Sequence, residues 1–194
     1  MFVRALAARV SDENIQVRGV PTSVRTAELA QELGIPLATL DAIDGIDIDV
    51  DGADEVDPDL NLIKGHGGAL LRERVVASVS SRFVVIVGED KLVPRLGSKR
   101  SVPVEVVPFA APVASQRLAQ MGATVALRLV EDTPFVSDNG NHILDATFPE
   151  IENPGDLERR IDVLPGVVDN GLFVGMADEV LVQAGADHRR MSRP

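Results

Sequence analysis

Amphipathic helix patterns alternate with short buried-strand patterns along the first hundred residues of the chain. Apolar spacing predicts helices over residues 22–34 and 69–80, and apolar runs or strict alternation predict strands over residues 46–51 and 83–87. The connections between these segments are short. Helices and strands that alternate in this way are typical of proteins with a central parallel sheet. The pattern therefore predicts an α/β fold with a Rossmann-like parallel-sheet domain.

The pattern changes after about residue 101. A good hairpin turn, Asp138-Asn139-Gly140-Asn141, divides two strands predicted within residues 135–148. The further elements expected here are strands over 102–107, 124–129 and 167–174, and helices over 113–121 and 156–164. The resulting β-α-β-β-α-β order predicts a small α+β (ferredoxin-like) domain. We expect it to occupy residues 102–174, inserted into a catalytic domain formed by residues 1–101 and 175–194, whose sheet receives a last strand over 179–183.

Composition narrows the classes of function. The 194 residues carry 19 Lys and Arg against 30 Asp and Glu, which gives a formal net charge of −11. Such an acidic chain without Trp or Tyr is not expected to bind nucleic acid. The absence of Cys excludes disulfides and thiolate metal sites. No apolar run approaches the roughly 18 residues of a membrane helix, and Arg4 and Arg9 interrupt the only candidate targeting segment. We expect a cytoplasmic protein that does not bind membranes.

Residues 26–63 contain no Lys or Arg, and the acids within them allow three interpretations. A solvated surface is the simplest. Asp47, Asp49, Asp51 and Gly52 also spell the first half of a calcium-binding loop, but Pro58 stands where the bidentate Glu would be required. The third interpretation is a strand that ends near Asp51 and places Asp51 and Asp54 in a loop, where ligands of α/β sheets bind.

Two further groups of residues follow predicted strands. Lys64 leads into Gly65-His66-Gly67-Gly68, whose backbone could approach an anion closely, and a helix carrying Glu73 comes next. Glu73 could equally be an ordinary surface carboxylate paired along its helix. Four cations then follow residues 83–87, and they suggest either an anionic ligand or a solvated basic face: Lys91, Arg95, Lys99 and Arg100.

Taken together, these residues resemble the ribose-5-phosphate isomerase type A family. The matching segments are spread over nearly the whole chain: Asp51-Gly-Ala-Asp-Glu-Val56, Ile63-Lys-Gly-His-Gly-Gly-Ala-Leu-Leu-Arg-Glu-Arg74, Asp90-Lys91, Pro103-Val-Glu-Val106, Ser137-Asp-Asn-Gly-Asn141, Pro165-Gly-Val-Val168 and Gly171-Leu-Phe173. One such segment would be weak support, whereas the set in this order is specific.

The resemblance implies interconversion of D-ribose 5-phosphate and D-ribulose 5-phosphate through an enediolate, with no metal and no organic cofactor. It implies that Glu73 is the general base and that Asp51 handles ring opening and proton shuttling. Asp54 and Lys64 match the other catalytic positions. The implied substrate-binding residues are Asp51, Gly52, Ala53, Asp54, Lys64, Gly65, Gly67, Gly68 and Lys91. The implied assembly is a homodimer or a dimer of dimers. A sugar-phosphate deaminase or transferase of related fold is an alternative, but the segment from Lys64 to Glu73 fits the isomerase better.

Two departures from the family pattern bear on activity. His66 stands where the family usually has Gly. Phe2, Leu6 and Val10 form the apolar stripe of a helix. This helix resembles the family's helix that follows a strand and a phosphate-binding Gly-Thr-Gly-Ser-Thr turn. That strand and that turn are absent from this sequence. We therefore expect a shortened chain, or a start codon placed too late, with poor stability and weak or no activity. The alternative function is a truncated sugar-phosphate-binding homologue without efficient turnover.

Overall fold

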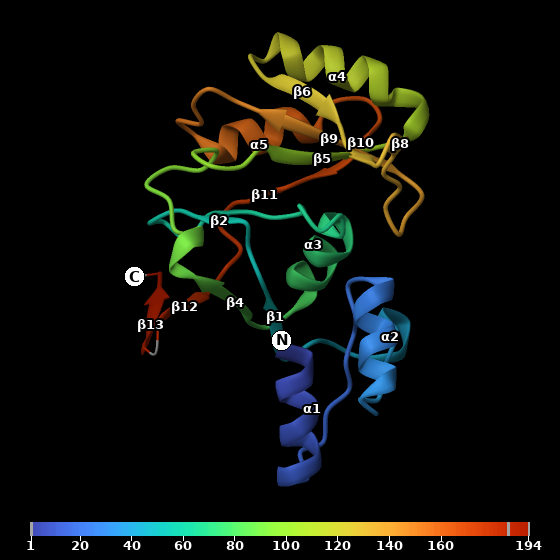
Figure 1. Ribbon diagram of the computed structural model, residues 1–194, viewed down its shortest axis with the longest axis vertical. Helices are drawn as coiled ribbons and strands as arrows, with labels where there is room; N and C mark the ends of the chain where they lie inside the picture. Colours follow the sequence, from blue (N-terminus) through green and yellow to red (C-terminus); the bar gives the residue numbers. More distant parts are fainter. Residues whose placement is uncertain (1, 186, 194) are drawn as a thin grey trace.

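The computed structural model describes residues 2–185 and 187–193 of the chain. Two four-stranded sheets lie at different levels of the molecule, with helix α3 (Leu70–Val79) between them (Figure 1). The second sheet, with its two helices, forms the upper end in this view, and helices α1 (Phe2–Glu13) and α2 (Val24–Glu32) form the lower end. Within the described residues, no helix is both long and apolar enough to cross a bilayer.

The first sheet is parallel except at one edge. Its order is β1-β4-β12-β13, with β4 parallel to both β1 and β12 and with β13 antiparallel to β12. The bounds are β1 (Asp49–Asp51), β4 (Phe83–Gly88), β12 (Glu179–Ala184) and β13 (Asp187–Ser192). Phe83, Val85, Val180 and Val182 are buried in one apolar cluster on one face of this sheet, whereas Ile86 on the other face is 40% exposed. The predicted return of the chain to this sheet is confirmed, whereas β13 was not predicted.

The second sheet is antiparallel throughout, in the order β10-β5-β9-β6. Its elements are β5 (Val102–Val106), α4 (Ala111–Gln120), β6 (Thr124–Leu127), β9 (His142–Thr147), α5 (Pro154–Asp162) and β10 (Val167–Asn170). This is the β-α-β-β-α-β arrangement, and its apolar cluster includes Val104, Leu118, Leu144 and Ile161. The predicted fold class is confirmed.

A three-stranded sheet, β11-β3-β2, joins the two larger ones and corrects one prediction. Its strands are β2 (Glu55–Val56), β3 (Leu62–Ile63) and β11 (Leu172–Phe173). The single strand expected over 167–174 is split at Gly171, whose amide donates to Pro103 O at 2.7 Å and whose carbonyl accepts from Lys64 N at 2.9 Å. A Cβ at Gly171 would lie 2.3 Å from Lys64 O, so only glycine lets the chain pass between the sheets.

The expected pair of strands over 135–148 is also wrong in its first half. Strand β7 (Leu129–Val130) pairs with β8 (Thr133–Pro134), and residues 135–141 form a loop before β9. The side chains of Ser137, Asn139 and Asn141 bind the buried carboxylate of Glu105. This segment is therefore held in place by side-chain hydrogen bonds and not by pairing as a strand. Three short 3-10 helices complete the described elements: η1 (Leu40–Ala42), η2 (Glu89–Lys91) and η3 (Pro108–Ala110).

Candidate active site

Three charged side chains that are distant in sequence meet beyond the end of β1. Lys64 Nζ lies 2.9 Å from Asp51 Oδ2 and 3.2 Å from Glu73 Oε2, and it also donates to Gly52 O at 2.5 Å. The side chain of Lys64 is only 2% exposed, while those of Asp51 and Glu73 are 26% and 14% exposed. A buried ammonium between two carboxylates is thus accessible to a ligand only from the carboxylate side.

Each member of this cluster comes from a different element. Asp51 is the last residue of β1, Lys64 directly follows β3, and Glu73 lies in the first turn of α3. The carboxyl ends of parallel strands are the usual place for a ligand in an α/β sheet. The predicted strand does end at Asp51, and Asp54 lies in the loop that follows it, so this interpretation is confirmed, whereas the surface-carboxylate interpretation of Glu73 is wrong.

The glycines between Lys64 and α3 allow a tight loop. Gly65 and Gly68 have φ values of +97° and +85°, and Gly68 N donates to Gly65 O at 3.0 Å. A Cβ at Gly65 would lie 2.8 Å from Leu70 Cβ, whereas Gly67 has open space around it. The loop thus brings Lys64 and α3 close together, and Gly67 leaves backbone accessible.

His66 and Asp54 hold this loop. Asp54 Oδ2 accepts from the His66 amide at 3.0 Å, and His66 Nε2 lies 3.1 Å from Ser101 O. Arg128 donates to the carbonyls of Gly65 and His66 at 2.9 and 3.1 Å. The departure from Gly at position 66 therefore adds a side-chain contact to the segment that leads into β5.

Burial and charge shift the proton affinities of the cluster. Burial raises the pKa of Glu73, and although the neighbouring Lys64 ammonium opposes this, Asp51 and Asp54 add to the increase. Burial alone would lower the pKa of Lys64, but Glu73 and Asp51 outweigh it and raise that pKa. Glu73 Oε2 is buried and faces the Lys64 ammonium at 3.2 Å. The cluster thus combines a permanent cation with a carboxylate that can accept a proton.

Lys91, by contrast, does not contact this cluster. It lies in η2 with its Nζ 3.6 Å from Asp90 Oδ2, and its side chain is 30% exposed. The other predicted cations are engaged elsewhere, since Arg95 pairs with Glu150 and Lys99 Nζ donates to the carbonyl of Asp90 at 2.7 Å.

The calcium-binding interpretation is wrong. Asp47 is exposed, Asp49 is buried at 7% exposure, and Asp51 is paired with Lys64, so the three carboxylates do not converge. Across residues 2–185 and 187–193, no three His, Cys, Asp or Glu side chains lie together in a way that could hold a metal ion.

Arg74 is a partly buried residue whose role could not be predicted from the sequence. Its guanidinium donates to Asp169 at 2.6 Å, to Glu158 at 3.0 Å and to two carbonyls, and it lies 4.3 Å from the centre of the Phe173 ring. Lys64 Nζ lies 5.5 Å from the same ring. Arg74 thus fixes α3 to α5 and β10 and sets the rotation that turns Glu73 towards Lys64. In the sequence, only its partner carboxylates Asp169 and Glu158 could have indicated this role, and they lie far from Arg74 along the chain.

Replacing Arg74 with methionine should lower the free energy of unfolding by about 3 kcal/mol, because it leaves Asp169 and Glu158 without their shared cation. The matched control is Arg160→Met on α5, whose side chain is 55% exposed and lies 3.6 Å from Asp156. We expect that variant to cost less than about 1 kcal/mol. Urea unfolding of both variants measures the difference, and equal costs would contradict the anchoring role of Arg74.

A second missed carboxylate organises the loop beside α3. Glu105 is fully buried, and its Oε1 accepts from Ser137 Oγ at 2.7 Å, Asn141 Nδ2 at 2.9 Å and Asn139 Nδ2 at 3.1 Å. Asn139 Oδ1 in turn accepts from Arg72 Nε at 2.9 Å. The second sheet and its loop therefore hold α3, the helix that carries Glu73, through two separate contacts: Arg74 with Asp169, and Arg72 with Asn139.

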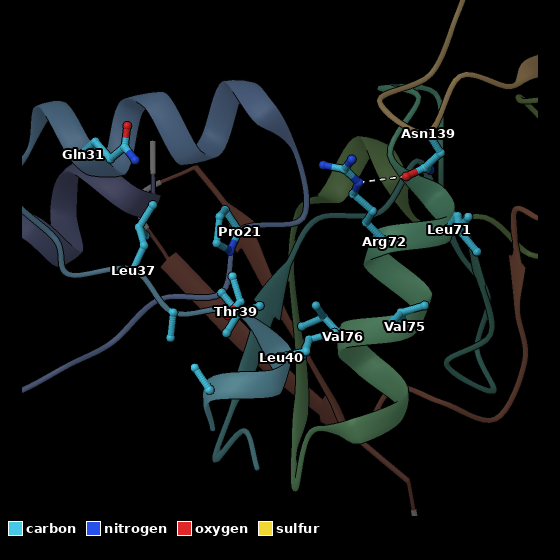
Figure 2. A pocket seen from close by; sticks show the side chains of 13 residues that line it. Pro21, Gln31, Leu37, Thr39, Leu40, Leu71, Arg72, Val75, Val76 and Asn139 are labelled. Atoms are coloured by element: carbon cyan, nitrogen blue, oxygen red, sulfur yellow. Dashed lines mark hydrogen bonds between the residues drawn. The ribbon is translucent and has the colours of Figure 1, made fainter. Parts of the chain in front are cut away.

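A cavity of about 770 Å³ is lined by residues of α3 and of the segment before β1, and Arg72 and Asn139, which share a hydrogen bond, also line it (Figure 2). Its wall is mainly apolar, with Leu37, Leu40 and Val76 among the side chains that face it. Neither Lys64 nor Glu73 lines it. We therefore place the chemistry at the charged cluster of Asp51, Lys64 and Glu73 rather than in this cavity.

Comparisons with known proteins agree with the chemistry of the cluster. Residues 18–187 match the family model described as ribose 5-phosphate isomerase A (phosphoriboisomerase A). Ribose-5-phosphate isomerase A of Roseiflexus castenholzii is 51% identical over 188 residues, which cover 96% of this chain and 80% of that protein. The protein of the same name from Thermococcus kodakarensis is 50% identical over 195 residues, covering 99% and 85%.

Solved structures give the same result. A D-ribose-5-phosphate isomerase in complex with phospho-erythronic acid superposes with a TM-score of 0.96 at 42% identity, covering 99% of this chain and 85% of that one. Ribose 5-phosphate isomerase A from Methanocaldococcus jannaschii has a TM-score of 0.95 at 41% identity, with the same coverage of both chains.

Proposed function

The chain belongs to the ribose 5-phosphate isomerase A family, and from this premise we infer that it interconverts D-ribose 5-phosphate and D-ribulose 5-phosphate. The observation that carries the mechanism is the position of Lys64 Nζ, 2.9 Å from Asp51 and 3.2 Å from Glu73. An aldose-ketose isomerisation needs a base for a weakly acidic C–H and a cation for the oxyanion that forms. The cluster contains both.

In the proposed reaction, Glu73 removes the proton from C2 of the open-chain aldose, and the electrons of that bond form the enediolate. Glu73 then returns the proton to C1, which yields the ketose. Lys64 opposes the negative charge on the substrate oxygens, and Asp51 assists ring opening and carries the proton between O1 and O2. Glu73 Oε2 is buried and paired with Lys64 at 3.2 Å, so the other carboxylate oxygen is the one that we expect to accept the proton.

The substrate-binding roles are also part of the proposal. Gly52 and Ala53 follow Asp51 on the loop that Lys64 contacts, and Gly67 offers open backbone. Gly65, Gly68 and Asp54 act by holding that loop, while Lys91 would reach the substrate from η2. We further propose that residues 102–174 act as an inserted domain supporting α3, and that the protein works in the cytoplasm as a homodimer or dimer of dimers.

The alternative, a sugar-phosphate-binding homologue with little turnover, is not favoured, because the relatives at about 50% identity are isomerases. This sets aside the expectation of weak or no activity, and we expect the purified chain to convert ribose 5-phosphate in D₂O and to incorporate solvent deuterium at C1 of ribulose 5-phosphate. Proton NMR measures both. Excess chelator should leave the rate unchanged, and phospho-erythronic acid should compete with the substrate. Binding of substrate without deuterium incorporation would instead support the homologue without turnover.

A further inference from the structure

Asp49 is a buried carboxyl group that the proposed reaction does not use. It is 7% exposed, and its Oδ2 has no hydrogen-bond partner in the described part of the chain. Its backbone amide donates to Arg82 O at 2.8 Å, which fixes its place at the start of β1. An unpaired buried carboxylate is costly, so a group of this kind either stays protonated or serves a purpose that offsets the cost.

The strand places Asp49 beneath the catalytic cluster. Asp49 and Asp51 are two residues apart on β1, so their side chains leave the same face of the sheet, and α3 packs on that strand. Ligands of a parallel sheet bind beyond the carboxyl ends of the strands, and Asp49 lies further from that end than Asp51. Asp49 is thus on the protein side of Glu73, away from the place where substrate oxygens would lie.

The charges that face Asp49 are those of the cluster. Asp51 comes from its own strand, Lys64 from the segment after β3, and Glu73 from α3. The paired strand β4 contributes only apolar residues and glycine, and the adjoining Arg82 side chain pairs with Glu179. The other two cations of α3, Arg72 and Arg74, are hydrogen-bonded elsewhere. Three carboxyl groups therefore share one buried ammonium.

We propose that Asp49 is a positioning residue of the isomerase site, whose ionisation strengthens Glu73 as a base without contact with the substrate. This rests on the proposed role of Glu73. During the reaction a negative charge moves from Glu73 to the substrate oxygens. A negative charge on Asp49 repels this charge more strongly while it is on Glu73, because Glu73 is closer to Asp49 than the substrate oxygens are. Transfer of the substrate proton to Glu73 then becomes more favourable.

The effect should be visible near neutral pH. Burial, followed by repulsion from Asp51, raises the pKa of Asp49 to about 7. Below that pH Asp49 is neutral, and above it the added charge increases the proton affinity of Glu73. A partial response of the rate to this stronger base predicts roughly a threefold increase in kcat.

The test compares kcat of the wild type, Asp49→Asn and Asp47→Asn from pH 5.5 to 9. We expect the ratio of wild type to Asp49→Asn to be near one at low pH and to rise about threefold through pH 7. The ratio cancels the ionisation of the substrate phosphate. Asp47 is exposed and two residues away on the same segment, so Asp47→Asn makes the same charge change and should give a constant ratio. A ratio for Asp49→Asn that does not change with pH would overturn the proposal.

A second measurement does not depend on activity. The folded protein keeps the proton of Asp49 up to about pH 7, whereas the unfolded chain loses it near pH 4. The wild type should therefore lose stability relative to Asp49→Asn as pH rises between these values. The difference in Tm should widen over that range and then stay constant. If it widens but no isomerisation is detected, the proposed function fails while the burial of an ionisable Asp49 stands. A constant difference would show that Asp49 does not hold the proton and would also overturn the proposal.

Discussion

Replacing Glu73 with glutamine should lower kcat by roughly 10²- to 10⁴-fold while KM for ribose 5-phosphate changes only a few-fold. Glutamine keeps the size of the side chain and cannot accept the C2 proton. The lost interaction is one that matters in the transition state, so binding of the ground state should be nearly preserved. Steady-state kinetics of ribulose 5-phosphate formation measure both constants.

The matched control is Glu28→Gln on α2, because it makes the same chemical change at an exposed helical position. Its kcat should equal that of the wild type. Glu73→Gln should also keep or increase the free energy of unfolding, since it removes a carboxylate whose burial raises its pKa. An activity of Glu73→Gln within tenfold of the wild type would remove Glu73 from the role of base, whatever the control does.

The layered fold could be predicted because its signals are local. The alternation of helix and strand patterns, and the β-α-β-β-α-β order after it, need only apolar spacing and turn residues. The strand split at Gly171 could not be predicted in this way, because its cause is the close approach of Lys64 and Pro103, which lie far away in sequence. The polar residues Asp169 and Asn170 before Gly171 interrupt the apolar run, but by themselves they do not show that the chain passes from one sheet to another.

The site was predictable in part. Asp51, Lys64 and Glu73 stood out through the family resemblance, while their spacing alone left a solvated surface open, because separations of 13 and 9 residues along the chain fix no distance in space. Asp49 looked like one acid among many, and its burial depends on α3 packing over β1. The anchor of α3 was missed for the same reason, since Arg74 finds its carboxylates more than 80 residues further along.

Replacing Lys64 with methionine should lower kcat by about 10³-fold or more, for two separate reasons. The oxyanion loses its cation, and one such interaction is worth roughly 10²- to 10³-fold. In addition, Lys64 is the neighbour that lowers the pKa of Glu73, whereas burial, Asp51 and Asp54 raise it. Without the ammonium, the pKa of Glu73 rises further, and a larger fraction of the base is protonated at neutral pH.

The two reasons differ in their dependence on pH. Protonation of Glu73 can be reversed by alkali, so part of the activity lost in Lys64→Met should return as pH rises, and its acid limb should lie at higher pH than in the wild type. The loss of oxyanion stabilisation is the same at every pH and should remain. The double variant Lys64→Met, Glu73→Gln should be little worse than the poorer single variant, because both residues act in one step. An acid limb of the pH profile that stays at the wild-type pH would mean that Lys64 does not control the protonation of Glu73. Fully additive losses of kcat in the double variant would mean that Lys64 and Glu73 act independently and not in one step.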